Sequence, residues 1–212
     1  MKLYFSRHGE SEANRLHIIS NRQLPHPLTE TGKEQATALA QRLHSEPIKR
    51  IYTSPIPRAL ETAEIVSAAL DVPYEPSDAL REYDCGILEG RSDAEAWTEH
   101  RRWVGNWLAG RDQDQGPQGG ETYQDIQKRF VPLIEALVRQ NQKISSEFIL
   151  IGHGGTYLFG LPSVLDNVDY DFILSHGLGN AQIITAGLRS CKLTCLAWEP
   201  LDPILDPSAP GK

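Results

Sequence analysis

Short apolar runs alternate with amphipathic helical segments along most of this 212-residue sequence. Residues 148–151 are apolar throughout, which is typical of a central strand covered on both faces. In the helical segments, apolar residues recur with a period of about 3.6 residues. The expected strands are 2–6, 50–54, 148–151, 181–185 and 191–198, with 186–189 between the last two and a possible strand at 72–75. The expected helices are one that begins near 28–32 and continues through 33–43, then 56–70, 92–110, 121–140 and one that opens at 152–155. This alternation predicts an α/β sheet domain.

The length of the chain allows one large domain or two small ones. Because no internal repeat or low-complexity linker divides the sequence, we expect a single domain at 1–198 with an inserted helical section at about 91–120. Residues 199–212 contain four prolines and are expected to form a loose tail.

The inserted section is rich in tryptophan. Its helical pattern places Trp97, Val104 and Leu108 on one face, and Trp103 and Trp107 flank that face. The plainer interpretation is a helix packed against the domain. The alternative is a lid, in which one of three nearby arginines binds the rest of a substrate: Arg101, Arg102 or Arg111.

Composition and charge exclude several classes of protein. Hydrophobic residues make up 40% of the chain and charged residues 23%, as in a soluble globular domain. No apolar run approaches the ~20 residues that span a bilayer, and the N-terminal apolar run is too short for a signal peptide, so we expect a cytoplasmic protein. The net charge of −7 argues against a general nucleic-acid binder or a binder of anionic membranes.

The three cysteines indicate reduced thiols. Cys85 is isolated, and their odd number and spacing do not fit a disulfide framework. Cys191 and Cys195 have no further cysteine or histidine ligand nearby, which argues against a metal site at this pair.

Two histidines stand directly after expected strands. The segment Arg7-His8-Gly9 follows the first strand, and Gly152-His153-Gly154-Gly155 follows the apolar strand at 148–151. Ligands of open α/β sheets bind beyond the carboxyl ends of the strands, where both histidines should therefore lie. Arg58 begins the helix after another strand and should join them.

Such a cluster of arginines and imidazoles requires an anion. The planar guanidinium matches phosphate oxygens, and the glycines let backbone N–H groups approach the same anion, so a phosphoryl group is the expected ligand. A neutral imidazole is a competent nucleophile, which makes a covalent phosphohistidine feasible. A leaving alkoxide would need a proton from a carboxyl group, for which Glu82 and Glu89 are candidates.

The sequence around these residues resembles the histidine phosphatase superfamily, also called the phosphoglycerate mutase-like family. The matching segments occur in family order from residue 3 to about 185, and together they are highly specific. They are 3–14 with Arg-His-Gly-Glu-Ser and Asn14, Pro-Leu-Thr-Glu-Thr-Gly at 27–32, Thr-Ser-Pro at 53–55 with Arg58 and 62–63, 80–90, Gly-Gly-Glu-Thr at 119–122 with Arg129, and 151–155. One departure is His26, where family members often carry an aspartate; it concerns the wall of the pocket rather than the chemistry.

The resemblance implies a three-layer α/β sandwich, with a mostly parallel central sheet and helices on both faces. It implies that His8 is the phosphorylated nucleophile, and that Glu82 donates a proton to the leaving group and then acts as base for water, while Glu89 is structural. It implies no metal and no other cofactor. The residues expected to bind the phosphoryl group or substrate are Arg7, Asn14, Arg58, His153 and Gly154, although Asn14 fits a capping or turn residue equally well.

The leading functional hypothesis is a phosphatase acting on a small phosphorylated metabolite, as a monomer or homodimer. The main rival is a bisphosphoglycerate-dependent phosphoglycerate mutase. Family mutases usually have a longer insertion after the acid segment and a His-Tyr-Gly-like stretch, whereas this chain has Tyr-Asp-Cys-Gly at 83–86, closer to the phosphatase branch and its fructose bisphosphatase domain. A third hypothesis is a catalytically inactive phosphate-binding or scaffold protein on the same fold.

Overall fold

The computed structural model describes residues 1–22, 24–141 and 146–200. Its centre is a six-stranded sheet in the order β3-β2-β4-β1-β5-β6. The strands are β1 (Lys2–Arg7), β2 (Ile48–Thr53), β3 (Tyr74–Pro76), β4 (Glu147–Gly152), β5 (Ile183–Arg189) and β6 (Lys192–Trp198). The first four run parallel to one another, and β5 pairs antiparallel with both β1 and β6. The expectation of a mostly parallel sheet is therefore confirmed.

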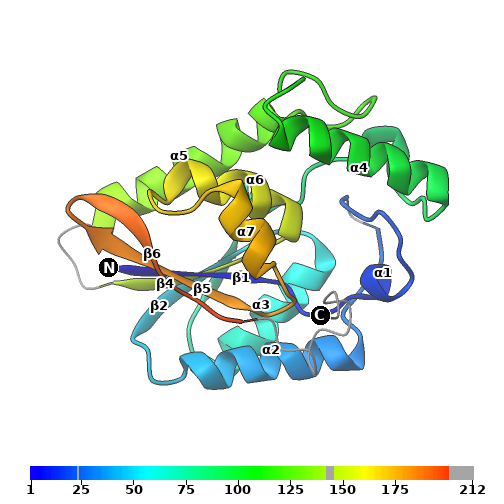
Figure 1. Cartoon of the computed structure of the whole chain (residues 1–212). Coiled ribbons are helices and arrows are strands. Elements are labelled where there is room, and N and C mark those ends of the chain that lie inside the picture. The colour runs from blue at the N-terminus through cyan, green and yellow to red at the C-terminus, as the bar shows by residue number, and fades with distance from the viewer. Residues whose placement is uncertain (23, 142–145, 201–212) are drawn as a thin grey trace.

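Helices cover both faces of the sheet (Figure 1). On one face lie α2 (Glu30–Leu43) and α3 (Pro57–Leu70), and on the other lie α5 (Tyr123–Asn141), α6 (Gly154–Val164) and α7 (Tyr170–His176). The short α1 (Glu12–Arg15) follows β1, and α4 (Ala94–Leu108) lies away from the sheet, above the edge where α1 is found. Two 3-10 turns, η1 (Asp78–Leu80) and η2 (Gly86–Leu88), connect β3 to α4.

Alternation along the central strands builds the two layers of core. In β1, Leu3 and Phe5 pack into the cluster under α5 and α6, whereas Tyr4 packs into the cluster under α2 and α3. In β4, Leu150 joins the first cluster and Ile149 the second. Successive side chains of a strand point to opposite faces, so an apolar run without polar residues requires helices on both sides.

A third buried cluster lies beneath α4 and includes Tyr83, Trp107 and Phe159. Trp107 is fully buried, with its indole edge-on to the rings of Tyr83 and Phe159. The face of α4 predicted to pack is therefore wrong in part: Ala96, Trp103 and Trp107 are its buried residues. The plainer expectation, a helix packed on the rest of the molecule, describes how α4 is held.

The last two strands also differ from the prediction. Residues 186–189, expected to separate them, belong to β5, and the turn is at Ser190 and Cys191. Both turn residues have left-handed backbone angles, with φ of 49° and 66°. Gly187 was misleading, because it pairs with Thr194 inside the ladder instead of breaking it.

The expected tail at 199–212 lies outside the described residues from 201 onward. Within the described part of the chain, no helix combines the length and apolar character that crossing a membrane would require.

Candidate active site

The parallel strands β1, β2 and β4 end at one edge of the sheet, where the candidate residues meet. His8 directly follows β1, and its backbone N–H donates to the Gly152 carbonyl at the end of β4 at 3.0 Å. From the segment between α7 and β5, Asn180 donates its side-chain amide to the His8 carbonyl at 2.8 Å. These contacts fix the backbone that carries His8.

The hydrogen bonds of His8 define its tautomer. Nε2 accepts a hydrogen bond from Nε of Arg58 at 2.8 Å, so the proton is on Nδ1, which donates to the Gly9 carbonyl at 2.6 Å. Burial, followed by the charges of Arg58 and Arg7, lowers the pKa of His8 well below its ordinary value. His8 is therefore a neutral imidazole at neutral pH, with its lone pair on Nε2.

Arg58 connects three partners at the start of α3. Besides His8, its guanidinium donates to the Ser20 carbonyl at 2.7 Å and to Nδ1 of His153 at 3.1 Å. Pro57 occupies the first turn of α3, where its missing N–H costs nothing. Burial lowers the pKa of Arg58 to about 10, so the group stays cationic at neutral pH.

His153 lies behind this pair and is fully buried. Because an arginine can only donate, Nδ1 of His153 is an acceptor, and Nε2 carries the proton that it donates to Oγ of Ser54 at 2.7 Å. The rings of His8 and His153 are 5.0 Å apart between centroids. Burial, followed by the charge of Arg58, lowers the pKa of His153 well below its ordinary value.

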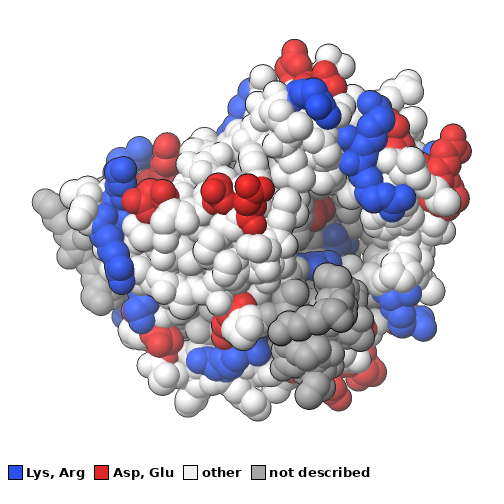
Figure 2. All heavy atoms as spheres, viewed as in Figure 1, with Lys and Arg blue, Asp and Glu red and all other residues white. Residues whose placement is uncertain are grey.

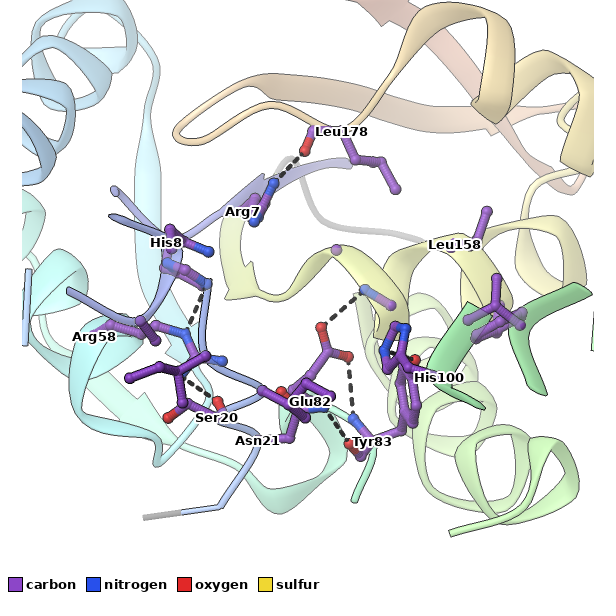
Figure 3. A pocket seen from close by; sticks show the side chains of 18 of the residues that line it. Arg7, His8, Ser20, Asn21, Arg58, Glu82, Tyr83, His100, Leu158 and Leu178 are labelled. Carbon is purple, nitrogen blue, oxygen red and sulfur yellow. Dashed lines mark hydrogen bonds between the residues drawn. The ribbon is translucent and has the colours of Figure 1, made fainter. Parts of the chain in front are cut away.

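Glu82 lies across the site from His8 (Figure 3). Its carboxylate accepts hydrogen bonds from the backbone N–H groups of Gly155 at 2.9 Å and Thr156 at 2.8 Å, in the first turn of α6, and from that of Tyr83 at 3.0 Å. The N-terminus of a helix favours such a negative group. A Cβ on Gly155 would lie 2.3 Å from the Tyr83 ring and 2.7 Å from Glu82, so this turn requires glycine.

Other expected residues hold the site together. Glu89 accepts hydrogen bonds from the backbone of Asn21 and Arg22, in the loop whose Ser20 carbonyl binds Arg58. Its expected structural role agrees with these contacts. Glu121 pairs with Arg129 at 2.9 Å and accepts the backbone N–H of Asp84, which fixes the segment that carries Glu82.

Asn14 is part of a capping box at the start of α1. Its Oδ1 accepts hydrogen bonds from the backbone and hydroxyl of Ser11, at 3.1 and 3.0 Å. The capping role is therefore present, and Asn14 also lines the cavity described next. Arg7 donates from Nη1 to the Leu178 carbonyl at 2.9 Å and lines the same cavity.

One cavity of about 490 Å³ brings these groups together. Six of the seven expected site residues line it: Arg7, His8, Asn14, Arg58, Glu82 and Gly154. His153 contacts Arg58 from behind instead of lining the cavity. Figure 2 shows a hollow on this side of the molecule with basic atoms in its depth.

Sequence reasoning missed several residues of this site. Ser54 follows β2 directly, and its hydroxyl accepts the hydrogen bond from His153. It could have been predicted, because it follows a strand that ends at the same edge of the sheet. His100 is not among the expected site residues, yet it lines the cavity, and its Nε2 is 2.6 Å from the Tyr83 hydroxyl. Helical spacing could have indicated this position. His100 lies three residues after Trp97 and four before Val104, so the three share one face of α4, and all three line the cavity. His26, the departure from the family pattern, contacts the Ser20 hydroxyl at 2.8 Å.

None of the arginines that the lid hypothesis assigned to substrate lines the cavity. Arg102 pairs with Glu99 at 2.5 Å, and Arg101 donates to the Thr98 hydroxyl at 3.3 Å. Arg111 donates to the side-chain oxygen of Asn106 at 3.2 Å.

The chain is similar to known proteins in sequence and in fold. The family model of the histidine phosphatase superfamily (branch 1) matches residues 3–200. A probable phosphoglycerate mutase, GpmB, from Photorhabdus laumondii is 35% identical over 170 residues, which are 77% of each chain. The fructose-2,6-bisphosphatase TIGAR B of Danio rerio is 31% identical over 76% of this chain and 58% of its own length.

Solved structures share the fold over nearly the whole chain. YhfR of Bacillus stearothermophilus is 25% identical, with a TM-score of 0.79 over 96% of this chain and 98% of its own. A mycobacterial glucosyl-3-phosphoglycerate phosphatase is 24% identical, with a TM-score of 0.80 over 94% and 99%. With the family model matched from residue 3 to residue 200, this chain belongs to branch 1 of the histidine phosphatase superfamily.

Proposed function

We propose that this protein is a phosphatase that hydrolyses a small phosphomonoester through a covalent phosphohistidine on His8. The observation that carries the proposal is the pair formed by His8 and Arg58. A neutral imidazole with its lone pair on Nε2 faces a cavity, and a cationic guanidinium donates to that same nitrogen.

The first step transfers the phosphoryl group to His8. Arg58 turns its N–H groups from Nε2 to the phosphoryl oxygens, so that the lone pair attacks phosphorus in line with the leaving oxygen. The Nε2–P bond forms and the P–O bond to the alcohol breaks, while protonated Glu82 gives its proton to the leaving oxygen. The Gly9 carbonyl, which accepts the Nδ1–H of His8, stabilises the positive charge that develops on the ring.

The second step returns the enzyme to its starting state. The Glu82 carboxylate takes a proton from water, the water oxygen attacks phosphorus, and the P–N bond breaks to release inorganic phosphate. Arg7 and Arg58 stabilise the negative charge on the phosphoryl oxygens in both steps. The position of Glu82 across the site from His8 supports its action on the group opposite the nucleophile.

Rapid quenching into alkaline SDS after mixing with radiolabelled p-nitrophenyl phosphate tests this proposal, because the P–N bond of phosphohistidine survives in base and hydrolyses in acid. We expect label on the wild-type protein and on His44→Asn, a control at an exposed histidine, but none on His8→Asn. Turnover without label on the wild-type protein would exclude the phosphohistidine. Absence of both label and turnover would favour an inactive phosphate-binding protein.

A second assay distinguishes phosphatase activity from phosphoglycerate mutase activity. With 3-phosphoglycerate and 2,3-bisphosphoglycerate, a mutase transfers the phosphoryl group faster than it releases phosphate, and a phosphatase does the reverse. We expect phosphate release to dominate.

A further inference from the structure

Beyond Glu82 the cavity changes character. Its walls there are apolar side chains from α4, α6, α7 and the loop after α1: Ile18, Trp97, Val104, Leu158 and Leu174. Trp97 is held in place because its indole N–H donates to the His17 carbonyl at 2.8 Å. In Figure 3, Leu158 and His100 lie on the far side of Glu82 from His8 and Arg58.

Cationic groups are confined to the phosphoryl end. Among the described residues that line the cavity, the charged ones are Arg7, Arg58 and Glu82. Both arginines are beside His8, and Arg58 donates directly to it. A second anionic group on the substrate would thus meet apolar walls and no further cationic side chain among these lining residues. Burying an anion without a cationic partner is strongly unfavourable.

His100 does not supply the missing charge. Its Nε2 forms a 2.6 Å hydrogen bond with the Tyr83 hydroxyl, and the two rings are stacked. Burial, followed by the charge of Arg101, lowers the pKa of His100 to about 4, so the ring is neutral at neutral pH. It offers the substrate a polar contact without a charge.

We propose that the preferred substrate is the phosphomonoester of an apolar, uncharged alcohol of aryl or arylalkyl size, and that the apolar wall selects the leaving group. This inference rests on the proposed phosphatase function. It disfavours substrates with a second phosphate or a carboxylate, including phosphoglycerates and sugar bisphosphates.

The comparison of substrates must separate how well the alcohol portion fits the cavity from how reactive it is as a leaving group. We therefore choose 2-phenylethyl phosphate, glycerol 3-phosphate and 3-phosphoglycerate, all of which are esters of unactivated alcohols. We expect kcat/KM for 2-phenylethyl phosphate to exceed the other two by at least about 10-fold, since even one methylene in a hydrophobic pocket can contribute that much.

Turnover of p-nitrophenyl phosphate distinguishes failure of the proposed phosphatase function from failure of the proposed substrate class. No turnover of this activated ester would contradict the phosphatase function itself. Turnover of it, combined with equal or faster hydrolysis of glycerol 3-phosphate or 3-phosphoglycerate than of 2-phenylethyl phosphate, would overturn only the substrate class.

A matched pair of variants tests the wall directly. Leu174 on α7 and Ile87 in η2 are both 59% exposed, but only Leu174 lines the cavity. We expect Leu174→Lys to lower the ratio of kcat/KM for 2-phenylethyl phosphate to that for 3-phosphoglycerate about 10-fold or more, because it adds a cation and removes an apolar contact. Ile87→Lys should leave this ratio within about 2-fold. An unchanged ratio in Leu174→Lys would overturn the proposal.

Discussion

At the scale of single residues, hydrogen bonds assign different tasks to chemically similar groups. His8 and His153 are both buried and neutral, yet only His8 lines the cavity, whereas His153 has both ring nitrogens bonded to Arg58 and Ser54. The sequence predicted that these histidines would meet, because each follows a strand. It could not predict which nitrogen carries the proton, since that depends on the partners that tertiary packing provides.

Glu82 and Glu89 differ in the same way. They are only seven positions apart in the sequence, but Glu82 lines the cavity and Glu89 binds backbone N–H groups of residues 21 and 22. At the level of sequence, only the resemblance to the family distinguishes the two carboxylates. The residues themselves leave both as candidates, because the loop that carries them has no regular period.

We expect Glu82→Gln to slow esters with poor leaving groups more than activated esters. Glutamine preserves the shape but has no acidic proton, and p-nitrophenolate leaves without protonation. Hydrolysis of 2-phenylethyl phosphate should fall about 10²- to 10⁴-fold, the usual contribution of a general acid. Hydrolysis of p-nitrophenyl phosphate should fall much less when the phosphorylation step is measured in a single turnover. Equal losses on both esters would remove Glu82 from the acid role.

Arg58→Lys tests whether geometry or charge matters at this position. Lysine keeps the charge, but its single nitrogen cannot reach His8, Ser20 and His153 together as the guanidinium does. We expect kcat to fall at least about 10²-fold, as when one transition-state donor is lost elsewhere. The control is Arg50→Lys, at an exposed arginine that pairs with Glu75. Near-normal kcat in Arg58→Lys would show that charge alone suffices.

At the scale of elements, the strand–turn–helix units could be predicted from the sequence, whereas the inserted helical section at about 91–120 could be predicted only in part. Strands β1, β2 and β4 and helices α2, α3 and α5 occur where periodicity placed them, within a few residues. The buried face of α4 was wrong in part, because its apolar residues form one broad stripe and periodicity cannot choose the centre of that stripe. Ala96, Trp103 and Trp107 are buried, whereas Trp97, Val104 and Leu108 are partly buried against the same cluster. Trp107 is buried because it packs against Tyr83 and Phe159, which are distant from it in sequence.

The first turn of α6 offers a second pair of matched variants. A Cβ on Gly155 would overlap the Tyr83 ring and approach Glu82, whereas a Cβ on Gly154 would meet only Arg7, at 3.7 Å or more. We expect Gly155→Ala to lower the free energy of unfolding by about 1–3 kcal/mol, the usual cost of overpacking. Gly154→Ala should change it by less than about 1 kcal/mol. Urea denaturation measures both, and equal effects would contradict the close packing at Gly155.

At the scale of the whole molecule, the site unites segments from nearly the full length of the chain. Residues 7–8 follow β1, Arg58 begins α3, Glu82 lies between η1 and η2, and 153–156 open α6. The sequence predicted that Arg7, His8, Arg58 and His153 would meet, because carboxyl ends of parallel strands share one sheet edge. Glu82 was placed at the site by its chemistry and by the family resemblance. The apolar half of the cavity was not predicted, because α4 and α7 close it from outside the sheet and no motif marks their cavity-facing residues.

The folding stability of the protein should depend on pH, because His8 and His153 are buried, and His100 is half-buried, in neutral form. Their folded-state pKa values lie below the ordinary value of 6.5. The unfolded chain therefore binds more protons as pH falls below 6.5, and folding stability decreases with it. Between about pH 7.5 and about pH 5.5, each of these histidines should lower the free energy of unfolding by roughly 1.4 kcal/mol, or about 4 kcal/mol for the three.

Carboxyl groups with lowered pKa values, such as Asp93 at about 2, titrate below this pH range. The change in stability within the range is therefore assigned to the histidines. Urea denaturation at the two pH values should show the loss, and His153→Asn should reduce it by about 1.4 kcal/mol. The exposed-site variant His44→Asn should leave the loss unchanged. If His153→Asn loses as much stability as the wild-type protein on acidification, then His153 is protonated in the folded state. A protonated ring could not accept a hydrogen bond from Arg58 through Nδ1, so the arrangement of the site would be wrong at that residue.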